Sequence, residues 1–198
     1  LRRMKPTNPP PRGFPESEFA ARLDKAQAAM AAAGLDALLL TTEPEFRYFS
    51  GFLTQFWQSP TRPWFLIVPS ADDPVAVIPS IGVPLMASTW IADIRSWRAP
   101  DYDDDGVSLL ATTLGEITSE GAVIGVPSGL ATHLRMPLGD WDRVQAAIGS
   151  RRFEGDGAIV QSQRMIKSPA EIRKISAACA VADRAFARAV RLDAEAAA

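Results

Sequence analysis

The chain has 198 residues, of which 47% are hydrophobic and 22% charged, and its formal net charge is −2. This balance is typical of a globular protein, and the length allows one sizeable α/β domain whose core needs no disulfide. Without a long basic block, the charge gives no support for nucleic acid or an anionic membrane as a partner. Cys179 is the only cysteine, which excludes an intrachain disulfide and a Cys-based zinc site and fits a cytoplasmic location.

The first residues carry charges and prolines but no apolar segment, so we expect no signal peptide there. The Pro9-Pro10-Pro11 run indicates an extended or disordered lead-in over residues 1–17. No later apolar run approaches the length of a membrane span, so no membrane partner is expected.

Apolar residues at three- and four-residue spacing from Phe19 onward predict a helix that Ser17 caps and Gly34 ends. Residues 37–40 form a short apolar run without a polar face, which predicts a buried strand. A short helix is expected after Glu43-Pro44, followed by an aromatic loop over residues 52–63.

Residues 64–68 and 75–78 read as strands, and the Asp and Pro between them favour a hairpin turn. Further helices are predicted at 83–90, 107–117 and 138–148, and further strands at 94–97, 123–126 and 152–154. Because helices and strands alternate around one hairpin, the predicted fold class is α/β: a mixed β-sheet with helices on both faces.

Near the carboxyl end, Ser168, Pro169 and Glu171 occupy the N-cap, first and third positions of a predicted helix. A serine cap with a glutamate three residues later is a capping box, and proline is favoured at the first position. The Ala-rich helix runs to Ala198 without a glycine or another breaker, so we expect the chain to be part of a longer one.

These segments resemble a known family. Three patterns occur in its order: G-L-D-A-L-L-L at 34–40, Y-F-S-G-F at 48–52 and R-x-I-K-S-P-x-E-I at 164–172. They are similar to the amino-terminal domain, and its junction with the catalytic domain, of creatinase, prolidase and aminopeptidase P proteins (the M24 metallopeptidases). The resemblance implies a ribonuclease H-like domain over residues 18–162. Residues 163–198 would be a linker and the first helix of the catalytic domain.

The resemblance also implies a parent enzyme whose carboxy-terminal domain binds two divalent metal ions (Mn, Co or Zn) through two Asp, one His and two Glu. Two such ions can polarise a carbonyl and supply hydroxide at neutral pH. Those ligands would lie beyond Ala198, so this chain is expected to hold no cofactor and to be inactive alone. Expected partners are its own catalytic domain, a peptide substrate and further copies in a homodimer or higher homo-oligomer.

The activity that the resemblance favours is Xaa-Pro peptide hydrolysis, with this chain as an oligomerisation and substrate-gating domain. One alternative is the amino-terminal domain of a creatinase-type C–N hydrolase, because the same domains host several substrates. The other is a stand-alone binding or oligomerisation module of a catalytically dead relative. Residues after Ala198 would distinguish these.

The aromatic loop holds Phe56, Trp57 and Arg62, and large rings are costly to leave exposed unless something covers them. In the resembling family this region lends side chains to the substrate pocket of a neighbouring subunit. Phe56, Trp57 and Arg62 are therefore candidates for a pocket rim or a subunit interface. The alternative, that the rings belong to the core or to the end of a hairpin, stays open.

Two motifs resemble functional loops only in part. Asp101-x-Asp103-x-Asp105-Gly106 matches the first half of a calcium loop, but Thr112 stands where the loop needs a glutamate, so an acidic turn before a helix is predicted. Residues 125–129 fit neither a nucleophile elbow nor a phosphate loop, and a strand-to-helix turn is predicted.

Two single residues also have ordinary interpretations. His133 has no second histidine or cysteine nearby in sequence, which favours a surface or partly buried histidine over a ligand. Cys179 lies on the apolar side of the Ala-rich helix, so we expect a buried, unreactive thiol.

Overall fold

The structure, a computed structural model, describes residues 9–59 and 62–196. The chain divides into two compact units. The first, here the sheet unit, spans residues 15–165, and the second combines the residues before Pro15 with those after Met165. The domain bounds 18–162 and 163–198 stay a prediction.

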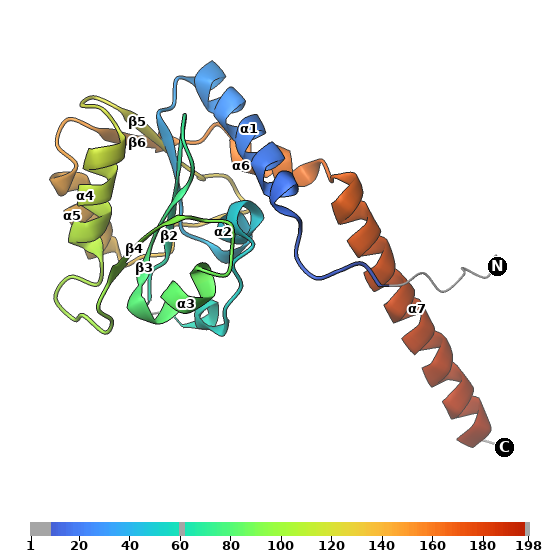
Figure 1. Ribbon diagram of the computed structural model, residues 1–198. Helices are drawn as coiled ribbons and strands as arrows, with labels where there is room; N and C mark the ends of the chain where they lie inside the picture. The colour runs from blue at the N-terminus through green and yellow to red at the C-terminus, as the bar shows by residue number, and fades with distance from the viewer. Residues whose placement is uncertain (1–8, 60–61, 197–198) are drawn as a thin grey trace. The chain divides into compact units, whose positions relative to one another are not determined.

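The sheet unit contains one six-stranded sheet in the order β4-β3-β2-β1-β5-β6 (Figure 1). The strands are β1 Ala37–Leu40, β2 Phe65–Pro69, β3 Val75–Pro79, β4 Asp93–Trp97, β5 Val123–Val126 and β6 Arg152–Gly155. β2 pairs antiparallel with both β1 and β3, whereas the pairs β1 with β5, β3 with β4 and β5 with β6 are parallel. The predicted mixed sheet is confirmed.

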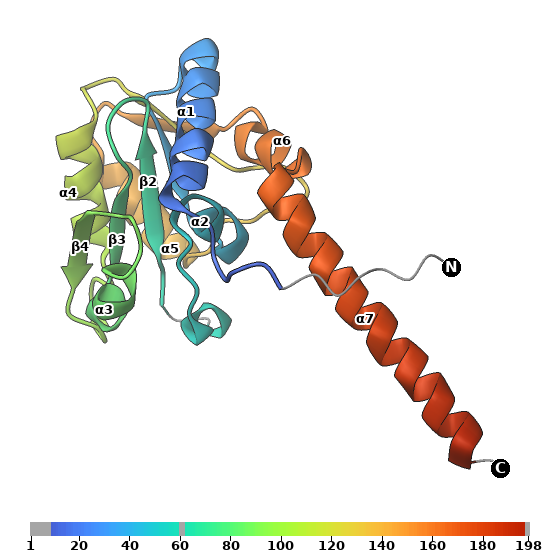
Figure 2. The same ribbon diagram turned by 45° about the vertical axis from the view of Figure 1, so that its right-hand side comes forward.

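Helices cover both faces of this sheet, as predicted (Figures 1 and 2). One face carries α1 Glu16–Ala33, α2 Glu43–Ser50, α3 Val83–Met86 and α6 Ile159–Met165; the other carries α4 Val107–Ile117 and α5 Leu138–Ala147. Two short 3-10 helices, η1 Gln55–Gln58 and η2 Ser80–Gly82, complete the sheet unit.

The apolar run of β1 is explained by its position between two cores. Leu38 and Leu40 belong to the core under α1 and α2, whereas Ala37 and Leu39 belong to the core under α4 and α5. All four side chains are completely buried. Successive side chains of a strand point to opposite faces, so a strand covered on both sides needs an apolar residue at every position.

Three predicted details of the helices are wrong. α1 begins at Glu16, one residue before the predicted cap Ser17, and Pro15 precedes it without a side-chain cap. The helix predicted over 83–90 ends at Met86, because the chain turns there and the hydroxyl of Thr89 donates to the carbonyl of Met86 at 2.7 Å. The sequence prediction also lacked α6, which has only seven residues.

The second unit contains α7, Pro169–Ala196, and its predicted capping box is confirmed. The N–H of Glu171 donates to Ser168 Oγ at 3.1 Å, and the N–H of Ser168 donates to Glu171 Oε2 at 2.8 Å. In the same unit Lys174 donates to the carbonyl of Pro11. Cys179 is exposed, like most described side chains along α7, so its predicted burial is wrong.

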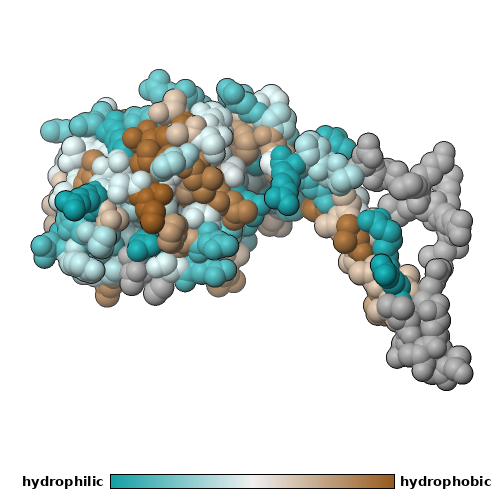
Figure 3. All heavy atoms as spheres, turned by 60° about the horizontal axis from the view of Figure 1, so that its bottom comes forward, coloured by the Kyte–Doolittle hydropathy of each residue, from teal (hydrophilic) through white to brown (hydrophobic). Residues whose placement is uncertain are grey.

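No helix in the described part of the chain has both the length and the apolar composition needed to cross a membrane. The surface that faces the viewer in Figure 3 carries a group of apolar side chains on the sheet unit. Ile81 of η2 and Leu85 of α3 are large apolar side chains that are about half exposed, at 49% and 43%.

Candidate functional site

Three loops meet around a cavity of about 440 Å³ at one end of the sheet. Two follow the carboxyl ends of the parallel strands β4 and β5, and the third enters the amino end of β2, which runs the opposite way. Strand direction therefore brings the three loops to the same end of the sheet. The charged residues that line this charged cavity are Arg62, Asp101, Asp103, Asp104, Asp105, Arg135, Asp140 and Arg143.

The aromatic loop divides its three candidate residues between the core and the cavity. Trp57 is only 8% exposed, and its ring lies 5.2 Å from that of Phe46 and 5.8 Å from that of Trp64, measured between centroids. Phe56 is half-buried and stacks on Trp64 with a centroid distance of 6.5 Å. The core interpretation of the rings thus describes Trp57 well, whereas Arg62 lines the charged cavity.

Arg135 fastens the aromatic loop to the loop that follows β5. Its guanidinium lies 5.3 Å from the centroid of the Trp57 ring, a cation–π distance. It donates to the carbonyl of Arg62 at 2.6 Å and to the carbonyl of Ser59, while its backbone N–H donates to Thr41 Oγ1 at 3.0 Å. Burial lowers the pKa of Arg135 from its ordinary value.

Arg62 is held much more loosely. Its guanidinium lies 5.0 Å from the centroid of the Phe56 ring, and the side chain is half-buried at the wall of the cavity. Within the described residues its guanidinium has no hydrogen bond or ion pair. A guanidinium whose N–H groups are not otherwise engaged can bind a carboxylate through two parallel hydrogen bonds.

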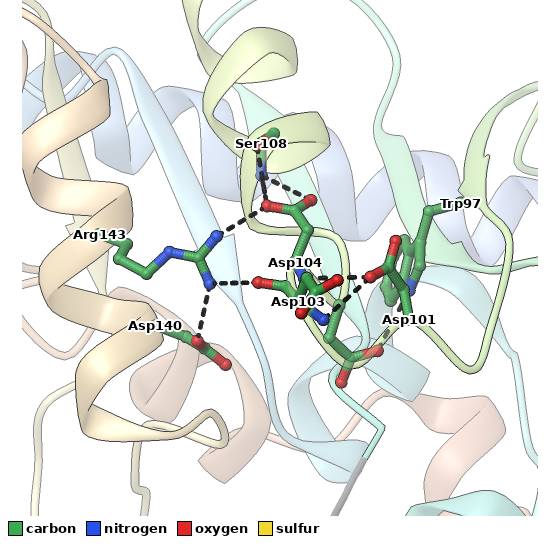
Figure 4. A network of polar contacts seen from close by, with 8 residues as sticks. Trp97, Asp101, Asp103, Asp104, Ser108, Asp140 and Arg143 are labelled. Atoms are coloured by element: carbon green, nitrogen blue, oxygen red, sulfur yellow. Dashed lines mark hydrogen bonds and ion pairs between the residues drawn. The ribbon is translucent and has the colours of Figure 1, made fainter.

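The acidic turn, residues 101–106, forms one wall and is organised by local hydrogen bonds (Figure 4). Asp101 Oδ1 accepts the N–H groups of Asp103 and Asp104, both at 3.1 Å. Asp104 accepts the N–H of Ser108 at 3.2 Å in the first turn of α4. The predicted acidic turn before a helix is confirmed, and no group of three or more His, Cys, Asp or Glu that could hold a metal ion occurs among the described residues.

The remaining wall joins this turn to α5. Arg143 donates to Asp104 Oδ1 at 3.0 Å, to the carbonyl of Asp103 at 3.1 Å and to Asp140 Oδ1 at 3.4 Å (Figure 4). Asp105 accepts the indole N–H of Trp97 at 3.2 Å, and burial raises the pKa of Asp105 above its ordinary value. The described lining carries charges of both signs, five aspartates and three arginines, and so suits binding of a charged ligand.

A second, much smaller hollow is lined by residues that follow β1, β5 and β6. In the sheet, β2, β3 and β4 lie on one side of β1 and β5 and β6 on the other, so the order of the strands reverses at β1. Open α/β sheets commonly bind ligands at such a point. Here the hollow measures about 30 Å³, and buried Glu45 and Asp156 line it. Thr42 Oγ1 donates to Glu45 Oε2 at 2.6 Å, and Asp156 accepts the N–H of Val160 at 3.1 Å. The two buried carboxylates at this point of the sheet therefore accept hydrogen bonds that stabilise the local structure.

The other predicted motifs have ordinary positions. β5 ends at Val126 and α5 begins at Leu138, so residues 125–129 do start a connection from a strand to a helix, although a long one. His133 is exposed, as predicted. The described residues therefore do not fit the two-metal centre that the family implies, which needs a histidine grouped with several carboxylates.

Sequence reasoning missed Arg135, which holds the aromatic loop in place. Its sequence neighbours are apolar or neutral and give no periodicity, and its partners lie 73 and 76 residues earlier in the chain. Asp156 was missed as well, although an aspartate followed by Ile159 and Val160 is a signal for a short capped helix.

Comparison with known proteins gives a consistent result. The family described as Creatinase/Prolidase N-terminal domain matches residues 22–166. The probable dipeptidase PepE of Mycobacterium tuberculosis H37Rv is 28% identical over 179 residues, which are 89% of this chain and 44% of the relative. The chain thus spans less than half the length of the curated relatives that it matches.

Solved structures agree in fold. The crystal structure of dipeptidase PepE from Mycobacterium ulcerans superposes with a TM-score of 0.67 and 25% identity, over 89% of this chain and 44% of that one. The prolidase from Thermococcus sibiricus reaches a TM-score of 0.72 at 20% identity, over 87% and 44% of the two chains. The second likeness supports the fold alone.

Proposed function

Because the chain belongs to the creatinase/prolidase N-terminal domain family, we propose that it is the assembly and substrate-gating domain of a Xaa-Pro dipeptidase. The observation that carries this proposal is the match to proteins named dipeptidases, over 89% of this chain and 44% of theirs. In this proposal the chain joins a larger carboxy-terminal domain in one polypeptide.

Hydrolysis belongs to that other domain in the proposal. Two divalent ions (Mn, Co or Zn) would supply the activated water there, and a peptide ending in proline would be the substrate. No group of three or more His, Cys, Asp or Glu that could hold such ions occurs among the described residues of this chain. In this proposal the chain instead holds subunits together and shapes access to the substrate pocket. A cytoplasmic location fits the single cysteine, and the proposed assembly is a homodimer or higher homo-oligomer.

The gating part of the proposal rests on Arg62, with Phe56 and Trp57 in support. Phe56 stacks against the Arg62 guanidinium, and Arg135 on Trp57 fixes the backbone of the loop by binding the Arg62 carbonyl. The guanidinium of Arg62 therefore sits on a fixed support while keeping its donors available. A Xaa-Pro dipeptide ends in a carboxylate, the group that a guanidinium binds best. Arg62 would contact this carboxylate at the rim of the substrate pocket.

The test uses the full-length dipeptidase and an Ala-Pro substrate. We expect Arg62→Ala to raise KM about tenfold or more with little change in kcat, because a carboxylate contact is lost in substrate binding. Arg47→Ala is the matched control: Arg47 is an exposed arginine on α2, paired with Glu43 at 3.9 Å. The residues Leu1 to Ala198 alone should show no chelator-sensitive cleavage.

An unchanged KM in Arg62→Ala, with Arg47→Ala also unchanged, would reject the gating role. Chelator-sensitive turnover by the isolated chain would reject the proposal that the chemistry lies in the other domain.

A further inference from the structure

The outer edge of β6 is free to pair with another strand. β6 pairs with β5 on one side, and no other described strand pairs with it. The N–H of Arg152 donates to the carbonyl of Ala122, and that of Asp156 donates to the carbonyl of Val126, both at 3.0 Å. Since backbone groups alternate along a strand, Phe153 and Gly155 direct their N–H and C=O groups outward.

The side chains along this edge form a self-complementary pattern. Arg152 and Glu154 flank Phe153 and lie on the same face of the strand, opposite to Phe153. In an antiparallel pair of β6 strands centred on Phe153, Arg152 of each copy would stand opposite Glu154 of the other. Phe153 would exchange two backbone hydrogen bonds with its own copy. Twofold symmetry requires such an isologous arrangement.

We infer that β6 joins β6 of a second copy of this chain, antiparallel and centred on Phe153, so that two six-stranded sheets become one continuous sheet. The inference deepens the assembly role proposed above and rests on it. Opposite charges directly across an antiparallel pair stabilise it, and two such pairs form around one axis.

The charged side chains of β6 lie at the surface, where a partner can reach them. Arg152 pairs with Glu154 at 2.7 Å and donates to the carbonyl of Gly121 at 3.5 Å, but the Arg152 and Glu154 side chains remain 59% and 52% exposed. On the other face, Phe153 lies 4.4 Å from Trp141 of α5, between ring centroids, beside an open groove of about 450 Å³. The edge therefore offers both charge and open space to a second copy.

The opposite edge of the sheet provides the matched comparison. β4 also carries an acidic residue two positions from an arginine, Asp93 and Arg95. There, however, Arg95 also binds Glu116 and approaches Thr113 Oγ1 at 3.4 Å, both on α4. The Arg95 side chain is only 24% exposed, compared with 59% for Arg152, so β4 is the less suitable edge.

The experiment measures the mass of the 198-residue chain by sedimentation over a range of concentrations. We expect a dimer that Arg152→Glu and Glu154→Arg each weaken about tenfold or more, because each change places like charges opposite one another twice. The double variant R152E/E154R reverses both pairs and should restore dimerisation to within about threefold. Asp93→Arg on β4 is the control and should leave the dimer intact.

Several results would overturn the inference. These are a chain that stays monomeric at every concentration, single variants that leave the dimer unchanged, or a double variant that stays monomeric. Dissociation by Asp93→Arg, or by Ile81→Lys at the half-exposed Ile81 of η2 while the β6 variants stay dimeric, would place the interface elsewhere. Such results leave the gating role untouched, because that role fails only on the kinetics of Arg62→Ala.

Discussion

Arg135 and Arg62 reach the charged cavity from two different loops, and the fold uses them differently. Arg135 donates to two carbonyls of the aromatic loop and covers the Trp57 ring. Arg62 makes a cation–π contact with Phe56, and its guanidinium donates to none of the described residues. One arginine of the wall therefore holds the aromatic loop in place, whereas the guanidinium of the other is available to bind a ligand.

The largest effect is expected from Arg135→Ala. The variant leaves the carbonyls of Ser59 and Arg62 without their charged donor, so it should lower the free energy of unfolding by about 2 kcal/mol. Urea unfolding followed by tryptophan fluorescence would measure this, because Trp57 and Trp64 lie next to the change. Arg135→Lys keeps the charge but lacks the planar guanidinium, so its free energy of unfolding should lie between those of the wild type and Arg135→Ala. A loss below about 0.5 kcal/mol would show that Arg135 does not hold the loop.

A smaller effect is expected from Arg62→Ala. Only a partly exposed cation–π contact is removed, so the free energy of unfolding should fall by less than about 1 kcal/mol. The same urea titration applies, with Arg135→Ala measured beside it. If both variants lose the same amount, the distinction between a structural and an available arginine is wrong.

Much of this fold could be predicted from the sequence because its signals are local. The four apolar residues of β1 predict a strand buried on both faces, and the capping box at Ser168 and Glu171 predicts the start of α7. The short helices α3 and α6 were misjudged or missed. Their ends depend on single hydrogen bonds, such as those to Asp156, rather than on a repeating pattern.

The site was predictable only in part. The aromatic loop stood out by composition, and Arg62 was identified as a candidate. Which side of the loop each residue faces depends on tertiary contacts: Trp57 turns inward against Phe46, and Arg135 arrives from a loop more than 70 residues away. Sequence spacing carries no information on such contacts. The roles of Phe56, Trp57 and Arg62 in substrate access stay predictions.

The smallest effect concerns Asp105, which lies in the same wall. Burial raises its folded-state pKa above the ordinary value of 3.8, so the folded chain binds this proton more tightly than the unfolded chain does. Stability is therefore lost as pH rises from below 3.8 through the folded pKa. Asp105→Asn should match the wild type near about pH 3 and become slightly more stable by about pH 7. Thermal unfolding across this range measures the difference.

The same variant also tests whether the charge of Arg62 acts within the cavity. Asparagine can still accept the indole N–H of Trp97 and tolerates the positive φ of 42° at this position, so the two proteins differ mainly in charge. Arg62 lowers the pKa of Asp105 by its charge, against the effect of burial. In an Arg62→Ala background, the pKa of Asp105 should rise further and the stability gained by Asp105→Asn should increase. An unchanged gain would show that the Arg62 charge does not reach the acidic turn, and Arg62 would then have to act on a ligand alone.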